Sequence, residues 1–208
     1  MFTCQTCGKE FDVRQDILDR YPGWQPRQCL DCKNGTDNSP ATTSPTKGRD
    51  YTTAEVLETF TGGPETGVFT DGASQGNPGP GGWGAVQVRD GKIIDSAYGS
   101  EEHTTNNRME LMAIIAGLGM LSPDSTIDVY TDSQLVVNIL TKWAEGWKAK
   151  GWKKKSSGPI ANLELVQEAY ALTKQRPRVG IRWIKAHSGN RWNEYADSLA
   201  TAYRRDEF

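Results

Sequence analysis

The stretch Gly67–Asn77, GVFTDGASQGN, is the segment from which the fold can be worked out. Val68 and Phe69 suit a buried strand, and the glycine-rich turn residues that follow favour a loop. Asp71 is therefore expected where the strand ends, which is where ligands usually bind in an α/β sheet. An isolated TDG tripeptide fits a turn-capping aspartate better than a metal ligand, so a metal site here requires further acidic residues elsewhere in the chain.

The size and charge of the chain limit the possible classes of protein. Its 208 residues suffice for one ordinary domain and a small module. A formal net charge of -2 and a pI near 5.8 mean that any nucleic-acid binding must rest on local basic clusters. The chain has no apolar run of about 18 residues and no signal peptide, so we expect no membrane span and a cytoplasmic location.

The four cysteines form two CxxC pairs near the N-terminus, Cys4 with Cys7 and Cys29 with Cys32. Four thiolates in two such pairs suit tetrahedral Zn²⁺. Two disulfides are the weaker interpretation in a reducing cytosol, and no βαβ pattern supports a redox pair. We expect a zinc-binding module over residues 1–34.

The segment FTCQTCGKEF…PRQCLDC also resembles the small bacterial zinc-ribbon module. The resemblance concerns the structure and leaves the ligand open, because zinc ribbons bind nucleic acid, bind protein, or only hold a shape. The charged residues of the segment are nearly balanced and do not decide between these roles.

A linker is expected over residues 35–66, because NGTDNSPATTSPTK is polar and has no apolar periodicity. Within it, TTAEVLETF predicts a short helix near residues 52–60 with a threonine cap. The main domain is expected over residues 67–208.

This domain opens with alternating strand and helix patterns. Asp90-Gly91 between two apolar runs predicts a hairpin. The stretch TTNNRMELMAIIAGLGML has helical periodicity with Thr104 or Thr105 as the cap, and it places Glu110 in apolar surroundings. A buried carboxylate must be paired or must serve a function, because its bare burial costs free energy.

Two further carboxylates complete a set of four. Asp132 follows a strand predicted over Ile127–Thr131, and Asp197 lies inside the last predicted helix. Together with Asp71 and Glu110 they are hard oxygen ligands that suit two Mg²⁺ or Mn²⁺ ions in phosphodiester hydrolysis. His187, on a glycine-containing loop, is a candidate proton carrier, the alternative being an ordinary surface histidine.

The segment TKWAEGWKAKGWKKK interleaves tryptophans with lysines. Aromatic faces among cations suit contact with a nucleic-acid backbone. The alternative is a solvated helix whose tryptophans pack on a neighbour. The residues concerned are Trp143, Trp147 and Trp152 with Lys142, Lys148, Lys150, Lys153, Lys154 and Lys155.

Five ordered motifs within residues 67–204 resemble type 1 ribonuclease H of the bacterial kind. They are TDGASQGNPGPGGWGA, TTNNRMEL, TDSQLVV, KWAEGWKAKGWK and WIKAHSGNRWNEYADSLA. The resemblance implies an α/β fold with a five-stranded mixed sheet flanked by helices. It also implies a monomeric endonuclease that hydrolyses the RNA strand of RNA/DNA hybrids with two metal ions, leaving 5′-phosphate and 3′-hydroxyl ends.

The resemblance also assigns roles to individual residues. Asp71 matches the aspartate that bridges both metal ions, Glu110, Asp132 and Asp197 match the other ligands, and His187 matches a mobile histidine that assists proton transfer or product release. The positions that match substrate contacts are Gly76, Asn77, Thr105, Asn106, Asn107, Gln134, Trp143, Trp147, Lys148, Lys150, Trp152 and Asn162. Ala73 and Ala186 depart from the usual serine and glycine, and neither change removes a ligand.

Three alternatives remain open. The first is a hybrid-binding protein without catalysis, which the presence of all four acids disfavours. The second is another nuclease of the same fold, such as a resolvase or an integrase, which the basic segment and NNRMEL disfavour. The third treats the cysteine module as an adaptor that tethers the nuclease to a protein partner.

Overall fold

The computed structural model describes residues 2–4, 10–13, 50–155 and 158–205. The chain divides into two compact units, Met1–Ser44 and Pro45–Phe208. In the first unit, β1 (Phe2–Thr3) pairs antiparallel with β2 (Glu10–Phe11), and the rings of Phe2 and Phe11 lie 6.1 Å apart. Cys4 is buried, and Cys7, Cys29 and Cys32 lie outside the described residues.

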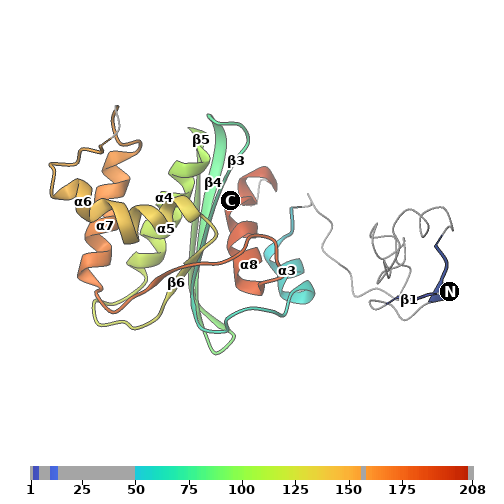
Figure 1. Cartoon of the computed structure of the whole chain (residues 1–208). Helices are drawn as coiled ribbons and strands as arrows, with labels where there is room; N and C mark the ends of the chain where they lie inside the picture. The colour runs from blue at the N-terminus through green and yellow to red at the C-terminus, as the bar shows by residue number, and fades with distance from the viewer. Residues whose placement is uncertain (1, 5–9, 14–49, 156–157, 206–208) are drawn as a thin grey trace. The chain divides into compact units, whose positions relative to one another are not determined.

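The second unit is built on one five-stranded sheet with the order β5-β4-β3-β6-β7 (Figure 1). Its first three strands are antiparallel neighbours, and β6 and β7 continue the sheet in parallel. This is the mixed sheet expected from the sequence. The strands are β3 (Gly67–Ser74), β4 (Gly79–Arg89), β5 (Lys92–Thr104), β6 (Val129–Thr131) and β7 (Ile181–Trp183).

The Asp90-Gly91 hairpin is confirmed. Both residues have positive φ, 50° at Asp90 and 71° at Gly91, as a two-residue turn between twisted strands requires. β6 begins two residues later than expected.

The expectation that β3 ends at Asp71 is wrong. The strand runs on to Ser74, and Asp71 pairs with Gly84 of β4. The glycines did not stop the strand, because its partner β4 is itself glycine-rich here and the two backbones pair through Ser74 and Gly81. What does end near Asp71 is the parallel ladder with β6, whose last pair is Thr70 with Thr131.

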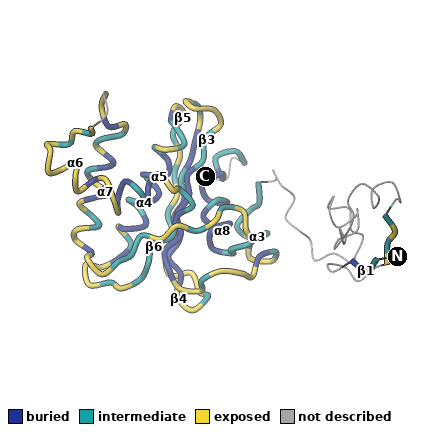
Figure 2. The backbone as a smooth tube through the Cα atoms, viewed as in Figure 1, coloured by how far each residue is buried: buried dark blue, intermediate teal, exposed yellow. Residues whose placement is uncertain are grey.

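Helices cover both faces of the sheet (Figure 1). One face carries a core centred on α4 and α7, with Val68, Ile114 and Val166 fully buried. The other face packs on α8 through Phe69, Val86 and Trp192. The central strands are accordingly the most buried part of this unit (Figure 2). The helices are α4 (Asn106–Gly119), α5 (Gln134–Asn138), α6 (Ala144–Lys148), α7 (Leu163–Gln175) and α8 (Arg191–Ala200), with a π-helical turn, η1 (Ile139–Trp143), and a 3-10 turn, η2 (Ala202–Arg205).

The helix predicted near residues 52–60 is confirmed as α3 (Thr53–Thr59). Thr52 and Glu55 form a reciprocal capping box at its start, which satisfies backbone N–H groups that have no partner inside the helix. α3 packs against α8, with Val56 and Phe60 buried. From Asp50 onward, the segment expected as a linker is therefore part of the second unit. No described helix has the length and apolar character needed to span a membrane.

Candidate active site

Two of the four carboxylates are placed by the sheet itself. Asp71 and Asp132 each follow directly after the last pair of the β3–β6 ladder, so the two side chains start from neighbouring strands at the same level. Asp132 is fixed further by Trp183, whose indole N–H donates to the Asp132 carbonyl oxygen at 3.0 Å. The Gly72 N–H donates to Asp71 Oδ1 at 2.7 Å, which orients that carboxylate.

Glu110 reaches the same point because α4 lies directly on the backbone of β3. Gly72 makes this possible, since a Cβ there would lie 2.2 Å from the Glu110 nitrogen. α4 starts at the predicted cap, Thr105, whose hydroxyl accepts from the Arg108 N–H. Glu110 is then one turn into the helix and nearly buried, and Asn106 donates to its Oε1 at 3.4 Å.

Asp197 comes from the opposite face of the sheet, on α8. The register partner of Asp71 is Gly84, and a Cβ at Gly84 would lie 2.6 Å from the carbonyl oxygen of Ala196. A glycine on each side of Asp71 thus lets one helix approach from each face. The carboxyl groups of Asp71 and Asp197 are close enough to share a hydrogen bond.

The electrostatics of the cluster are unfavourable for four charged carboxylates. Burial raises the pKa of Asp71 well above its usual value, and the charges of Asp132, Glu110 and Asp197 raise it further. Burial and the neighbouring charge of Asp132 also raise the pKa of Glu110, against the hydrogen bond from Asn106. Burial likewise raises the pKa values of Asp132 and Asp197.

The donor set fits a divalent cation. One carboxylate oxygen from each of Asp71, Glu110 and Asp132 can be chosen so that all three lie within 4.8 Å of one another. Glu110 Oε2 is buried and has no hydrogen-bond partner. Since a buried acceptor without a donor costs free energy, this oxygen is suited to a cation, and all-oxygen ligands suit Mg²⁺ or Mn²⁺.

A second group of possible ligands adjoins the first. It consists of His187, Glu194 and Asp197, again with ligand atoms within 4.8 Å of one another. His187 Nδ1 lies 3.6 Å from Glu194 Oε2, and the imidazole is 73% exposed whereas Glu194 is almost fully buried. The predicted histidine therefore lies beside the cluster on its solvent side.

Sequence reasoning missed two residues of α8 that belong to the site. Asn193 is fully buried and donates to the Asp132 carboxylate, while its own Oδ1 has no partner. Glu194 holds the histidine as described above. Both lie three or four residues before Asp197, the helical spacing that puts side chains on one face. That spacing was the available signal.

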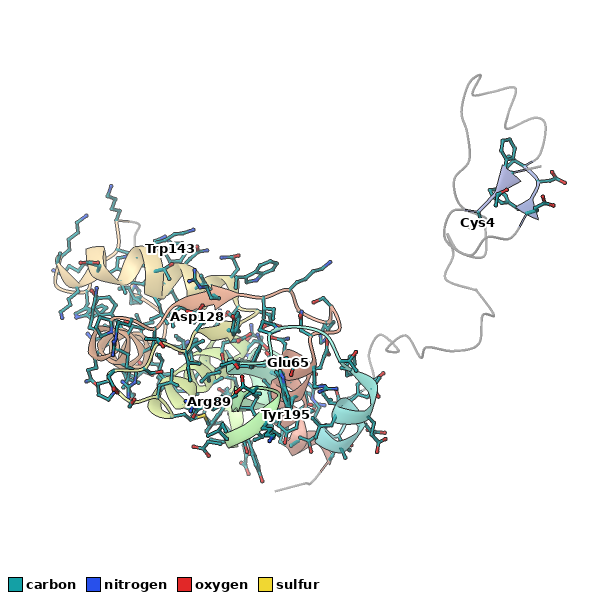
Figure 3. All side chains as sticks on the ribbon, turned by 90° about the horizontal axis from the view of Figure 1, so that it is seen from below. Cys4, Glu65, Arg89, Asp128, Trp143 and Tyr195 are labelled. Atoms are coloured by element: carbon teal, nitrogen blue, oxygen red, sulfur yellow. The ribbon has the colours of Figure 1, made fainter. Side chains whose placement is uncertain are left out.

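The lysine and tryptophan segment lines a basic groove of about 780 Å³, to which α4 contributes Asn107 and Leu111. Trp143 is 40% exposed, lies on the outer helical layer (Figure 3), and stacks at a tilt on Trp147 with centroids 5.8 Å apart. Among the predicted contacts, the structure brings to this groove Asn107, Trp143, Trp147, Lys150 and Asn162. The other lysines of the predicted basic segment that line the groove are Lys142, Lys153, Lys154 and Lys155.

Two other residues of the segment lie elsewhere. Trp152 meets the ring of Tyr170 edge-on at 5.9 Å and packs against the core, as the alternative interpretation of the tryptophans expected. Lys148 stands over the same ring at 5.6 Å.

The remaining predicted contacts surround the start of α4 and α5. Gly76 has a φ of +92°, a conformation that favours glycine. Asn77 Oδ1 accepts from the backbone N–H of Asn106 at 3.3 Å, which ties the glycine loop to α4. Thr105 caps α4, and Gln134 is exposed at the first position of α5.

Carboxylates gathered at the central strand of a mixed sheet, in a unit that also carries a basic groove, are typical of metal-dependent nucleases. The family model described as RNase H matches residues 64–205, and the chain belongs to the RNase H family. The family degrades RNA in RNA/DNA hybrids, and this chain is an enzyme of that family.

Curated relatives agree with this assignment. The Ribonuclease H of Agrobacterium fabrum is 50% identical over 133 residues, which cover 64% of this chain and 90% of the relative. The Ribonuclease H of Marinobacter nauticus is also 50% identical, over 64% of this chain and 89% of the relative.

Among solved structures, the chain is similar to LC9-RNase H1, a type 1 RNase H with the type 2 active-site motif. The two share 33% identity with a TM-score of 0.56, over 71% of this chain and 76% of the other. The N-terminal RNase H domain of Rv2228c from Mycobacterium tuberculosis, solved as a fusion with maltose-binding protein, is 29% identical with a TM-score of 0.50, over 68% and 96% of the two chains.

Proposed function

We propose that this enzyme hydrolyses the RNA strand of RNA/DNA hybrids endonucleolytically, with two Mg²⁺ or Mn²⁺ ions, and leaves 5′-phosphate and 3′-hydroxyl ends. The observation that carries the proposal is the buried carboxylate cluster around Asp71, with an unpartnered oxygen on Glu110. Bound divalent ions would activate a water and stabilise the leaving oxygen of the phosphodiester.

Each group of residues at the site has its own proposed role. Asp71, Glu110, Asp132 and Asp197 are the proposed metal ligands, and Asp71 is central because the charges of the other three all raise its pKa. Asn193 and Trp183 hold Asp132 in place through hydrogen bonds to its side chain and its backbone.

His187 is the proposed proton carrier. It is exposed, so it can exchange protons with solvent, and Glu194 faces its Nδ1 at 3.6 Å. A carboxylate in that position limits the directions in which the ring can point.

The substrate is proposed to bind along the basic groove. Its lysines supply phosphate contacts, and Trp143 and Trp147 offer ring faces to sugars or bases. Near the acidic cluster, Asn106 and Glu110 are the groups proposed to sense a ribose 2′-hydroxyl, which distinguishes RNA from DNA. Gly76 and Asn77 belong to the loop after β3, which Asn77 ties to the first residue of α4. Both are proposed to face the minor groove of the hybrid.

The first unit is proposed to be a zinc-ribbon-like module that binds one Zn²⁺ through Cys4, Cys7, Cys29 and Cys32. Its support is the spacing of the cysteines. It would add a contact to nucleic acid or to a protein partner. We further propose that the enzyme acts as a monomer in the cytoplasm, for which sedimentation of the purified chain and cell fractionation are the measurements.

The substitution Asp132→Asn tests the catalytic proposal. It removes a metal ligand without adding bulk, so we expect cleavage of a labelled RNA/DNA hybrid in Mg²⁺ to fall by about 100- to 1,000-fold, the range seen when a group that stabilises the transition state is removed. Hybrid affinity should stay within a few-fold of the parent value. The matched control is Asp95→Asn, the same chemical change at an exposed position on β5.

Full cleavage by the Asp132 variant would contradict the assignment of the site. A parent enzyme that binds the hybrid without cleaving it would favour the non-catalytic alternative. Cleavage of RNA duplex, DNA duplex or branched DNA in preference to the hybrid would favour another nuclease of the same fold.

A further inference from the structure

The segment just before the family match packs against α8, the helix that contributes Asp197 to the acidic cluster. We call residues 50–63 the strap; it comprises Asp50, α3 and the turn that follows. The RNase H family match begins at residue 64, so the strap lies outside it. In the structure it runs along α8, the helix that carries Asn193, Glu194 and Asp197 (Figure 1).

The strap is fastened to α8 at both ends. At its start, Asp50 forms an ion pair with Arg204 at 3.0 Å, just beyond the end of α8. In the middle, Val56 and Phe60 are buried, and a side-chain hydrogen bond joins Thr53 to Tyr195. Tyr195 lies on α8 next to α3 (Figure 3).

At its other end the strap meets the loop that carries His187. Gly62 forms a parallel bridge with Asn190, and the Arg191 N–H donates to the Gly62 carbonyl oxygen at 2.8 Å. The Arg191 guanidinium also donates to the Phe60 carbonyl oxygen. The first turn of α8 is therefore hydrogen-bonded to the strap.

The two glycines at this end of the strap lie close to the residues that follow His187. A Cβ at Gly62 would lie 3.1 Å from the Gly189 carbonyl oxygen, and a Cβ at Gly63 would lie 2.7 Å from Asn190 Oδ1. Gly189 is two residues from His187, and both have positive φ, +81° and +46°. The backbone beside the histidine thus rests against Gly62 and Gly63.

We propose that the strap is a positioning element for catalysis: Gly62 and Gly63 brace the histidine loop where it enters α8, and so hold His187 against Glu194. The proposal rests on the catalytic role proposed for His187. The physical reason is the position of the catalytic group, because its displacement by about 1 Å can lower the rate by up to about 100-fold.

The test compares two valine substitutions at adjacent positions. Gly62→Val places a branched side chain against the Gly189 carbonyl, whereas Thr61→Val places the same side chain at an exposed position one residue earlier. We expect Gly62→Val to lower kcat for hybrid cleavage by roughly 10-fold with little change in KM, and Thr61→Val to leave both unchanged.

A double-variant cycle separates positioning from general damage. In a His187→Ala background, Gly62→Val should have almost no further effect on kcat, because the group that the strap positions is gone. An effect of Gly62→Val that multiplies fully with that of His187→Ala would overturn the proposal. So would an effect no larger than that of Thr61→Val.

A measurement that does not use enzymatic activity tests the bracing role separately from the proposed function. Hydrogen exchange of the Arg191 N–H and of residues 185–190 should speed up in Gly62→Val and not in Thr61→Val, at equal global stability. Unchanged exchange in both variants would exclude a bracing role. If the parent enzyme does not cleave hybrid at all, the proposed function is wrong, and hydrogen exchange still decides whether the strap braces the loop.

Discussion

Gly72 fixes how closely β3 and α4 approach each other. Any Cβ at this position would lie 2.2 Å from the Glu110 nitrogen and 2.4 Å from the Met109 carbonyl carbon. These are backbone atoms inside a helix, so they cannot move aside as the end of a flexible side chain can. The separation of the Asp71 and Glu110 carboxylates therefore depends on the absence of a single methyl group.

We expect Gly72→Ala to lower the free energy of unfolding by about 3 kcal/mol, the upper part of the usual range for overpacking a core, and to reduce cleavage activity strongly. The control is Gly119→Ala, at the last residue of α4, where nothing lies within 4 Å of an added Cβ. Alanine there should be neutral or stabilise by up to about 1 kcal/mol, because glycine is a poor helix former. Urea unfolding of both variants provides the measurement, and equal stabilities would contradict the steric argument.

The residues of the site differ in how far the sequence could predict them. The four acids were recognisable because each stands out against its surroundings: Asp71 and Asp132 after apolar runs, and Glu110 and Asp197 inside helical patterns. Asn193 and Glu194 lie in the same stretch as Asp197, NRWNEYAD, but the motif resemblance assigned a role only to Asp197. Their role comes from their burial on α8 and from the hydrogen bond that Asn193 donates to Asp132, which a single sequence does not display.

At the scale of elements, the four carboxylates come from four different ones, β3, α4, β6 and α8. Their mutual repulsion therefore acts between elements that the rest of the fold holds together. Burial, together with this repulsion, raises the pKa values of Asp71 and Glu110 well above their usual values. Because the folded-state pKa values exceed the unfolded ones, the folded protein binds more protons.

The sign of the pH effect follows from this difference. The contribution of these groups to stability is complete below their unfolded pKa values, near pH 4, and is lost as the pH rises through the raised folded values. Without added divalent ions, the melting temperature should therefore fall between pH 5 and pH 8 more than it does with Mg²⁺ present, because a bound cation replaces the protons.

Thermal unfolding at the two pH values, with and without Mg²⁺, measures this effect. The Asp71→Asn variant is the control, since it removes the central charge and should reduce both the pH dependence and the stabilisation by Mg²⁺. A parent protein whose melting temperature responds to pH equally with and without Mg²⁺ would contradict the explanation.

The sequence predicted which helices and strands form better than it predicted where they end. Local signals placed the hairpin at Asp90-Gly91 and narrowed the cap of α4 to Thr104 or Thr105, since turns and caps depend on the residues themselves. The end of β3 was placed too early, because strand length depends on a partner strand distant in sequence. The packing of α3 on α8 was missed for the same reason: the contact joins residues more than 100 positions apart.

At the scale of the whole molecule, the chain consists of two units of different kinds. The second has a large apolar core on both faces of its sheet. In the first, the proposed Zn²⁺ would supply much of the stability, since so short a segment cannot bury enough apolar surface alone.

We expect the purified full chain to contain about one zinc per molecule by elemental analysis, in line with a four-cysteine structural site. Cys4→Ser should bring the zinc content below about half of that value, because three remaining ligands bind the metal less tightly. Cleavage of the hybrid at saturating concentration should be unaffected in this variant, since the four acidic residues lie in the second unit. A parent chain without zinc, or full zinc content in the variant, would exclude the proposed site.

The two glycines beside Asp71 have a consequence for how the enzyme tolerates sequence change. At Gly72 and at Gly84, helices α4 and α8 touch the sheet through main-chain atoms. These contacts set how near the two helices can come, whatever the size of the apolar side chains around them. Substitutions that shrink a core side chain are therefore expected to leave the distance across the acidic cluster unchanged, whereas those that enlarge one can push a helix away.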